Sequence, residues 1–313
     1  MNRKVLIGAP VHPVLTEGLQ ELGYELISAP KIDQSKAFEL IRDCEGVITS
    51  ARLNLNKELL DAAPKLKWIG RMGSGMEVID TVYATQKGII FFSSPEGNCN
   101  AVAEHALGML LNLTKRITWS RNEIVVGKWL REENRGTELE GKTIGIIGFG
   151  HTGRAFAKKL QGFDMQILVY DIVPQQNVPD YVTICSNLDP IFEQATIISF
   201  HVPLEDSTRN YFNQKFFEKI TQDFTLLNTS RGEIVVTEVL KEGLGTGKIK
   251  GAGLDVWREE PLERMSEWER TQLKELIQLP QVIITPHIAG YTFEALHKMS
   301  KTLLEKIIKN QLF

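Results

Sequence analysis

The fold of this chain is decided by the stretch Thr143-Ile-Gly-Ile-Ile-Gly148-Phe-Gly150-His-Thr-Gly153-Arg-Ala-Phe-Ala-Lys-Lys-Leu160. An apolar run ends in the spacing G-x-G-x-x-G, and an amphipathic helix pattern begins inside the glycine triplet. A second apolar run, Gln166–Tyr170, is followed by Asp171, which lies 18 residues after Gly153. This order of strand, glycine turn, helix, strand and acid is typical of a dinucleotide-binding site.

Each glycine of the turn has a physical reason to be glycine. Gly148 permits the tight turn out of the strand, Gly150 leaves room for a pyrophosphate, and Gly153 lets the helix pack close to the strand. The free N–H groups at the start of the helix then face the phosphates. We expect Asp171 to accept hydrogen bonds from the adenosine ribose and to repel a 2′-phosphate. No cation follows in Ile172–Pro174, so NAD is expected rather than NADP.

Composition is that of an ordinary globular protein. The 313 residues suggest two domains, 24% of them are charged, and the formal net charge is -3. No basic stripe indicates nucleic acid or an anionic membrane, and no apolar run approaches a membrane span. The N-terminus predicts a first strand rather than a signal peptide. Cys44, Cys99 and Cys185 are odd in number and lack metal spacing, so we expect reduced thiols, no metal and a cytoplasmic protein.

Short apolar runs alternate with helical patterns on both sides of the glycine motif. Such alternation predicts parallel sheets covered by helices on both faces. Before the motif, we predict strands at 4–8, 25–28, 46–50, 67–70 and 89–92, and helices at 14–22, 35–43, 57–63 and 78–86. After it, we predict strands at 167–170, 182–184, 195–200, 224–228, 252–256 and 282–284.

Two long helical patterns, at 100–115 and 291–310, mark the domain organisation. The first leads into the dinucleotide unit, and the second leads away from it and needs a surface to pack on. The first domain is its natural host. We therefore predict an α/β protein with two doubly wound parallel-sheet domains: a flavodoxin-like substrate domain of residues 1–99 plus 291–313, and a Rossmann NAD-binding domain of residues 100–290.

Polar residues follow three of the later predicted strands, at the strand ends where ligands bind in open α/β sheets. Arg231 is a permanent cation whose forked donors suit a carboxylate or a polarised carbonyl. His287 can exchange a proton near neutral pH, and Glu260 can stabilise its protonated form. Taken alone, each is better explained as a surface or structural group. Together, at the strand ends of a dinucleotide fold, they predict a catalytic site.

Further motifs extend over nearly the whole chain. They comprise His201–Leu204, Asn228–Gly232, Gly253–Val256, Glu259–Pro261 and Thr285–Gly290, with Gly70–Asp80 and Asn98–Glu104 upstream. As a set with Gly148–Gly153, they resemble the D-isomer-specific 2-hydroxyacid dehydrogenases. Gly127–Trp129 and Gly136–Gly145 are most similar to the phosphoglycerate dehydrogenase branch of that family.

The resemblance implies hydride transfer between NAD and a D-2-hydroxy acid or its 2-oxo acid. It implies that Arg231 orients the substrate, that His287 is the acid/base, and that Glu260 is its partner. It implies cofactor contacts at Gly148, Gly150, His151, Thr152, Gly153, Asp171, Val202, Pro203, Thr229, Ser230, Asp255 and Gly290. It implies substrate contacts at Arg52, Gly73, Ser74, Gly75 and Met76, the last four through an anion-binding nest of backbone N–H groups. A homodimer is also implied, through the dinucleotide domain and the helix near 100–115.

The substrate stays open at this point. D-3-phosphoglycerate dehydrogenase, glyoxylate/hydroxypyruvate reductase and erythronate-4-phosphate dehydrogenase are alternatives. The phosphoglycerate branch often binds phosphate near residues 49–52, where only Arg52 is basic. A non-enzyme alternative is an NAD-sensing co-repressor, because such relatives can keep the catalytic trio. Because the last predicted helix ends close to Phe313, we expect a short form without a C-terminal regulatory domain.

Overall fold

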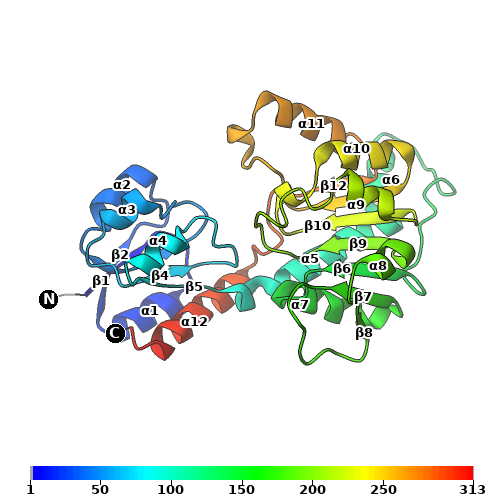
Figure 1. Cartoon of the computed structure of the whole chain (residues 1–313). Helices are drawn as coiled ribbons and strands as arrows, with labels where there is room; N and C mark the ends of the chain where they lie inside the picture. The colour runs from blue at the N-terminus through cyan, green and yellow to red at the C-terminus, as the bar shows by residue number, and fades with distance from the viewer. Residues whose placement is uncertain (1–2, 313) are drawn as a thin grey trace. The chain divides into compact units, whose positions relative to one another are not determined.

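The structure is a computed structural model that describes residues 3–312. It divides into two compact units (Figure 1). The first unit comprises the described residues up to Cys99 and from Gly290 onward, and the second comprises Asn100–Ala289. Each unit is built on one parallel sheet, so the predicted α/β class with two parallel-sheet domains is confirmed.

The first unit contains a five-stranded sheet in the order β2-β1-β3-β4-β5, which is the flavodoxin-like order. Its strands are β1 (Arg3–Ile7), β2 (Tyr24–Ser28), β3 (Cys44–Thr49), β4 (Trp68–Arg71) and β5 (Ile90–Ser93). Its helices are α1 (Pro13–Glu21), α2 (Gln34–Leu40), α3 (Lys57–Asp61), α4 (Thr81–Gln86) and α12 (Phe293–Lys309).

Side-chain caps set where most helices of the first unit begin. An Asp, Asn or Thr side chain accepts a first-turn backbone N–H at four of them: Asp33 at α2, Asn56 at α3, Asp80 at α4 and Thr292 at α12. The predicted helix 78–86 therefore starts only at Thr81, because Asp80 is the cap and Ile79 pairs with Leu55. The predicted helix 291–310 starts at Phe293 for the same reason.

The last helix, α12, packs beside α1 in the first unit (Figure 1). Its residues Met299, Leu303 and Ile307 are buried. Ser300 Oγ accepts a hydrogen bond from the backbone N–H of His12 at 2.9 Å, just before α1 begins. Residues near the two ends of the chain thus build one core.

The second unit contains a seven-stranded parallel sheet in the order β12-β11-β10-β9-β6-β7-β8. Its strands are β6 (Thr143–Ile147), β7 (Gln166–Tyr170), β8 (Val182–Ile184), β9 (Ile197–Phe200), β10 (Phe224–Asn228), β11 (Ile249–Leu254) and β12 (Val282–Ile284). Counted from β6, this is the Rossmann order with one more strand at the edge. The reversal of strand order falls between β6 and β9, where β6 delivers the glycine turn.

Helices of this unit cover both faces of the sheet, except α6, which has no buried residue. They are α5 (Pro95–Lys115), which crosses the boundary between the units, and α6 (Ile117–Val125), α7 (His151–Leu160), α8 (Asp189–Gln194), α9 (Gln214–Lys219), α10 (Thr237–Thr246) and α11 (Glu267–Ile277). Neighbouring residues of β6 point to opposite faces: Ile146 joins a core with Phe156 of α7, and Ile147 joins another with Phe200. Both faces of the sheet are therefore buried under apolar side chains and shielded from solvent.

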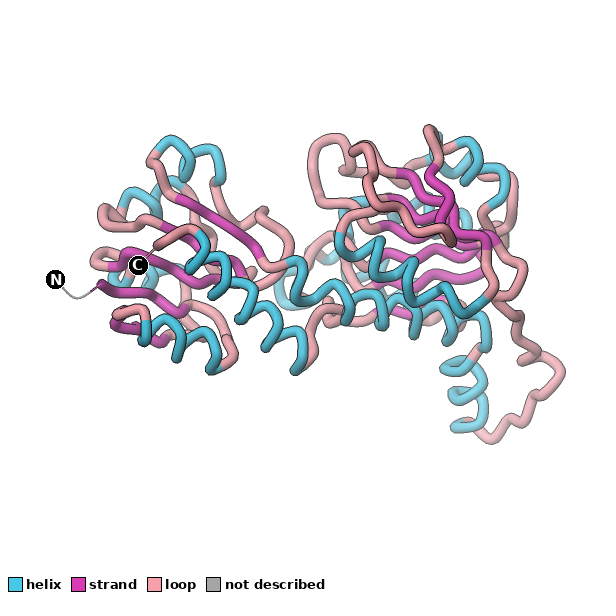
Figure 2. Tube along the Cα trace, turned by 90° about the horizontal axis from the view of Figure 1, so that it is seen from below, coloured by secondary structure: helices cyan, strands magenta, loops and turns pink. Residues whose placement is uncertain are grey.

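Strands β9 and β11 begin at Ile197 and Ile249 rather than at residues 195 and 252, and two helices also differ from the predicted elements. Helix α5 begins at Pro95 rather than residue 100, since proline fits the first turn of a helix, where its missing N–H costs nothing. Helix α6 has no predicted counterpart, because none of its residues is buried and its apolar periodicity is weak. Figure 2 shows α6 and the loop after it extending away from the sheet.

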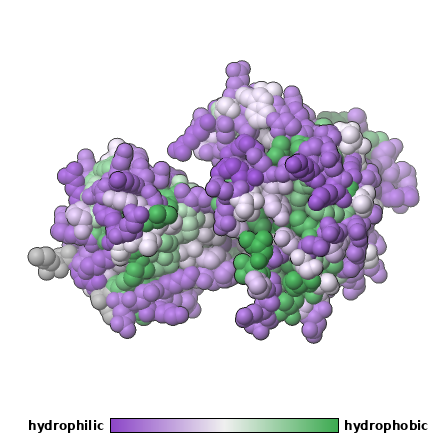
Figure 3. Space-filling model, viewed as in Figure 1, coloured by the Kyte–Doolittle hydropathy of each residue, from purple (hydrophilic) through white to green (hydrophobic). Residues whose placement is uncertain are grey.

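The surface seen in Figure 3 is mostly hydrophilic on each unit, with smaller apolar areas between the charged side chains. Among the described residues, no helix has the length and apolar character that a membrane span requires.

Candidate active site

The glycine turn after β6 has the geometry that its three glycines predict. Gly148 has a φ of +94°, and a Cβ there would lie 2.6 Å from the backbone oxygen of His201. A Cβ on Gly153 would lie 2.1 Å from the backbone oxygen of Gly148. At Gly150 a Cβ would meet nothing within 4 Å, so this side of the turn is open space. The tight positions thus shape the turn, and the open position leaves room for a ligand.

The start of α7 is suited to an anion. Gly150 is its N-cap residue, and no side chain caps it, in contrast to the capped helices of the first unit. The first-turn N–H groups, including those of His151 and Thr152, are therefore available to a phosphate. Thr229 Oγ1 is buried and has no hydrogen-bond partner among the described residues. These groups fit the pyrophosphate and neighbouring parts of NAD.

Asp171 lies at the end of β7 beside the glycine turn. One carboxylate oxygen accepts the Phe149 N–H at 2.5 Å, and the other accepts the Val173 N–H at 2.8 Å. Val202 also lies against the turn, since a Cβ on Gly148 would be 2.9 Å from its Cγ1. The structure thus places Asp171 and Val202 at one turn, as cofactor contacts would require.

Arg154 is a cation at the loop after Asp171 that the sequence analysis did not single out. Its guanidinium lies 4.6 Å from the centre of the Phe149 ring and donates to the carbonyls of Gln176 and Asn177 in the loop after Asp171. A sequence inspection of the residues next to Asp171 misses it, because α7 brings it there from the other side of the turn.

His287 and Glu260 form a hydrogen-bonded pair at the carboxyl edge of the second sheet. His287 Nδ1 and Glu260 Oε2 are 2.7 Å apart. The other carboxylate oxygen, Oε1, accepts the backbone N–H of Trp257 at 2.6 Å. An ionised carboxylate only accepts hydrogen bonds, so Nδ1 carries the proton and Nε2 is left to exchange a proton with a substrate.

Several charges decide the ionisation of Glu260. Burial is the largest influence and by itself would raise its pKa. The hydrogen bond and charge of His287, the Trp257 N–H and the charge of Arg231 outweigh burial together and bring the pKa below its ordinary value. Glu260 is therefore an anion at neutral pH and stabilises a positive imidazolium beside it.

Arg231 sits in a turn that Asn228 organises. Asn228 is buried at the end of β10; its side chain accepts the N–H and hydroxyl of Ser230 and donates to the Arg231 carbonyl at 2.8 Å. Immediately after Arg231, a Cβ on Gly232 would lie 2.0 Å from the Trp257 carbonyl carbon. The Arg231 turn and the segment that leads to Glu260 are therefore in direct backbone contact.

Asp255 holds the loop that carries His287. It is 1% exposed, and its carboxylate accepts Thr285 Oγ1 at 2.5 Å and the N–H groups of Ile288 and Ala289 at 2.9 and 2.7 Å. His105 Nε2 of α5 contacts Thr285 Oγ1 at 2.9 Å. His287 itself has a φ of +55°. Sequence reasoning gave Thr285 only as part of a motif and missed His105, because only the folded sheet brings β11, β12 and α5 together.

The remaining predicted cofactor residues lie on loops after the strands. Ser230 follows β10, Pro203 follows β9 and is exposed, and Gly290 closes the His287 loop at the start of the segment assigned to the first unit. The structure brings Arg231, Glu260 and His287 together in the second unit, as the sequence pattern predicts.

The predicted substrate loop, Gly73–Met76, follows β4 in the first unit. Gly73 has a φ of +126°, and its N–H already donates to Ser94 Oγ at 3.0 Å. The N–H of Gly73 is thus used internally, which the nest prediction did not foresee. A Cβ on Gly73 would lie 1.5 Å from Arg71 Nη1, so the guanidinium of Arg71 covers this turn. Arg52 is exposed, three residues after β3 ends.

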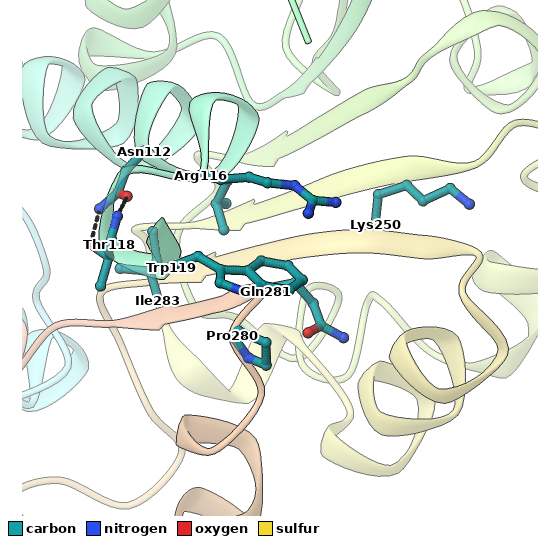
Figure 4. A pocket seen from close by; sticks show the side chains of 9 residues that line it. Asn112, Arg116, Thr118, Trp119, Lys250, Pro280, Gln281 and Ile283 are labelled. Carbon is teal, nitrogen blue, oxygen red and sulfur yellow. Dashed lines mark hydrogen bonds between the residues drawn. The ribbon is translucent and has the colours of Figure 1, made fainter. Parts of the chain in front are cut away.

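A cavity of about 50 Å³ in the second unit is separate from these groups (Figure 4). Lys250 at the start of β11 and Gln281 just before β12 line it, together with Arg116, whose guanidinium lies 4.4 Å from the centre of the Trp119 ring. These are the amino ends of the strands, whereas the catalytic candidates follow the carboxyl ends. Within the described residues, no group of three or more potential ligands could hold a metal.

The comparison with known families identifies the family of this chain. Residues 107–289 match the family model described as "D-isomer specific 2-hydroxyacid dehydrogenase, NAD binding domain". The chain belongs to this family. It is therefore an NAD-dependent oxidoreductase of the D-2-hydroxyacid dehydrogenase type, as the sequence motifs predict, and the glycine turn belongs to its NAD-binding domain.

Relatives within the 2-hydroxyacid dehydrogenase family carry different substrate names. A hydroxypyruvate reductase of Thermotoga maritima is 32% identical over 308 residues, which are 98% of this chain and 97% of the relative. Human D-3-phosphoglycerate dehydrogenase is 32% identical over 94% of this chain, but the match spans only 54% of the human protein. The structure of Aquifex aeolicus D-lactate dehydrogenase with NAD and lactic acid matches with a TM-score of 0.86 and 28% identity, over 99% and 96% of the two chains.

Proposed function

We propose that this chain interconverts a short D-2-hydroxy acid and its 2-oxo acid, with Arg231, Glu260 and His287 as its catalytic residues. The observation that carries the proposal is the pair of His287 and Glu260 at 2.7 Å, with the charge of Arg231 acting on the same carboxylate. NAD supplies the hydride acceptor or donor when it is bound.

Each catalytic residue has one task in this proposal. In oxidation, His287 Nε2 removes the hydroxyl proton of the substrate as hydride leaves C2. In reduction, the imidazolium gives that proton to the oxygen on C2 as hydride arrives. Arg231 orients the substrate by its carboxylate or carbonyl oxygen, and Glu260 stabilises the imidazolium.

For the substrate carboxylate we propose the backbone N–H groups of Ser74, Gly75 and Met76, which follow one another in the loop after β4. A three-carbon 2-oxo acid such as hydroxypyruvate is the substrate that the nearly full-length reductase relative supports. The second candidate is 3-phosphohydroxypyruvate. It is favoured by the guanidinium of Arg71 over the Gly73 turn, since arginine forks suit phosphate.

A panel of 2-oxo acids tests the function. We expect the purified chain to oxidise NADH with at least one of glyoxylate, pyruvate, hydroxypyruvate and 3-phosphohydroxypyruvate. NADPH should be the poorer donor, because the Asp171 carboxylate would repel a 2′-phosphate. Tight NADH binding without reduction of any acid would contradict the proposed catalysis and favour a sensing role. A preference for NADPH would contradict the role of Asp171.

We propose a homodimer that uses α6 and the loop after it, and a cytoplasmic location in line with only three cysteines, which lack metal spacing in the sequence. This part of the second unit exposes Ile124, Val125, Val126 and Trp129, the last by 82%. The same segment borders a cavity of about 370 Å³ that includes Ile124, Trp129 and Leu130. Exposed aromatic and aliphatic groups of this kind are typical of surfaces that a second protein surface covers. A second copy of the chain is the proposed partner, because most soluble oligomers are symmetric assemblies of identical chains.

Sedimentation tests the dimer. The parent chain is expected to sediment as a dimer at micromolar concentration, and Trp129→Lys with Val125→Glu is expected to sediment as a monomer. Val82→Glu is the matched control, because Val82 is also exposed (70%) but lies on α4 of the first unit. A monomeric parent chain, or a double variant that stays dimeric, would contradict the proposed surface.

A further inference from the structure

The segment between Asp255 and α11 contains a second carboxylate that the proposed reaction does not use. Glu269 lies in the first turn of α11 and is 1% exposed, although glutamate is seldom fully buried. Burying a carboxylate is costly unless it has partners, so its position requires a reason.

The sequence pattern assigns Glu269 a different task from the one it has. Ser266-Glu-Trp-Glu269 is the signature of a capping box, in which the glutamate reaches back to the N–H of the serine. In the structure, that N–H donates instead to Glu259 Oε2 at 2.6 Å. Glu259 has taken over the capping position, and the Glu269 side chain is turned inward.

The inward carboxylate faces Trp257 and Arg258. Glu269 Oε1 is 4.0 Å from Arg258 Nε. Burial raises the pKa of Glu269; the indole N–H of Trp257 and the charge of Arg258 oppose this effect, while Glu259 and Glu238 add to it. Trp257 Nε1 and Glu269 Oε2 are both buried, and neither has a hydrogen-bond partner among the described residues. The indole and the carboxylate are therefore each other's available partner.

Trp257 is also bound to the pair of Glu260 and His287. Its side chain is buried in the core of the second unit, and its backbone N–H donates to Glu260 Oε1 at 2.6 Å. Glu260 Oε2 in turn pairs with His287. Trp257 is thus linked through its backbone to Glu260 and His287, and its indole acts on the buried carboxylate of Glu269.

We infer that Glu269 is a positioning residue of the reaction, which acts through Trp257 to hold the Glu260 carboxylate on His287. Without Glu269, no carboxylate faces the buried indole N–H, and the Trp257 backbone N–H is held less firmly in its direction. Glu260 then contacts the imidazole less well, and an imidazolium without a close carboxylate gives up its proton more readily. This inference rests on the proposed function of His287.

The test is the pH profile of 2-oxo acid reduction for four variants. Glu269→Leu and Trp257→Phe are each expected to lower kcat roughly tenfold, about the effect of one disturbed hydrogen bond. Both should move the alkaline limb of the profile to lower pH, with the dissociation constant of NADH unchanged. Glu269→Gln retains an acceptor for the indole and should keep the parent profile. Glu267→Leu, an exposed neighbour on the same helix, should do the same.

The activity of the double variant distinguishes a positioning role of Glu269 from a general loss of stability. If the indole and the carboxylate act on Glu260 as one unit, Glu269→Leu with Trp257→Phe should lose no more activity than either single variant. A parent-like profile in Trp257→Phe would overturn the inference even if Glu269→Leu does not fold. If His287→Gln keeps its turnover, the proposed function fails. If His287→Gln is inactive while Trp257→Phe and Glu269→Leu keep the parent profile, only this inference fails.

Discussion

Replacement of His287 by glutamine is expected to lower kcat by about 10²–10⁴, the usual contribution of a general acid/base. Glutamine has similar polarity and reach, but it cannot take up or release a proton near neutral pH. The contacts of Asp255 with the backbone of the His287 loop remain, so the fold of the loop should persist. NADH affinity should be nearly unchanged, because the glycine turn and Asp171 are untouched. Steady-state kinetics and NADH fluorescence titration measure the two effects separately.

His297→Gln is the matched control for this variant. His297 lies on α12 of the first unit and contacts only the His12 ring among the described aromatic groups. It should retain the parent kcat. If His287→Gln turns over at a rate near that of the parent chain, His287 is not the acid/base. A loss of NADH binding would mean that the substitution disturbs the cofactor site rather than proton transfer.

Replacement of Gly232 by alanine is expected to remove most activity and some stability. The new methyl group would lie 2.0 Å from the Trp257 carbonyl carbon and 2.3 Å from the Arg258 nitrogen, so backbone has to move. The displaced segments bear Arg231 on one side and Glu260 on the other. We expect kcat/KM to fall by about 10²-fold or more, since a misplacement of about 1 Å can have this effect. Overpacking should also lower the unfolding free energy by about 1–3 kcal/mol.

Gly245→Ala provides the control for the methyl group itself. Gly245 lies in α10, and a Cβ there would meet nothing within 4 Å. Alanine at this position should raise stability slightly, because it favours the helix more than glycine does. Steady-state kinetics and thermal unfolding of both variants measure the expected changes in kcat/KM and in stability. Unchanged kinetics in Gly232→Ala would mean that the contact between the Arg231 turn and Trp257 has no role in placing the catalytic groups.

Local patterns were sufficient to predict the sheets and to place the proposed catalytic residues at the ends of strands in the second sheet. The turn at Gly148–Gly153 depends on backbone sterics that act over a few residues, so its shape can be read from its spacing. Arg231, Glu260 and His287 each follow a short apolar strand. Because all strands of the second sheet are parallel, such residues gather at one edge once the strands are recognised.

Contacts made across the fold were not predictable in the same way. The inward turn of Glu269 depends on Glu259, which occupies the capping position first. The internal use of the Gly73 N–H depends on Ser94, which β5 places beside it. Helix α6 lacks a buried face, so the hydrophobic periodicity of its sequence is too weak for a helix to be predicted from it. Each case is settled by a competition between partners that only tertiary structure brings together.

The place of α12 beside α1 has a consequence for synthesis on the ribosome. Chains emerge from the N-terminus, and domains generally fold in that order. Here Leu303 and Ile307 are fully buried parts of the first unit, so that unit stays incomplete until nearly the whole chain has been translated. The second unit, by contrast, is continuous from Asn100 to Ala289 and contains all of its own strands by then. The unit that begins the chain is therefore the last to be finished, and its exposed apolar surface has to be protected until then.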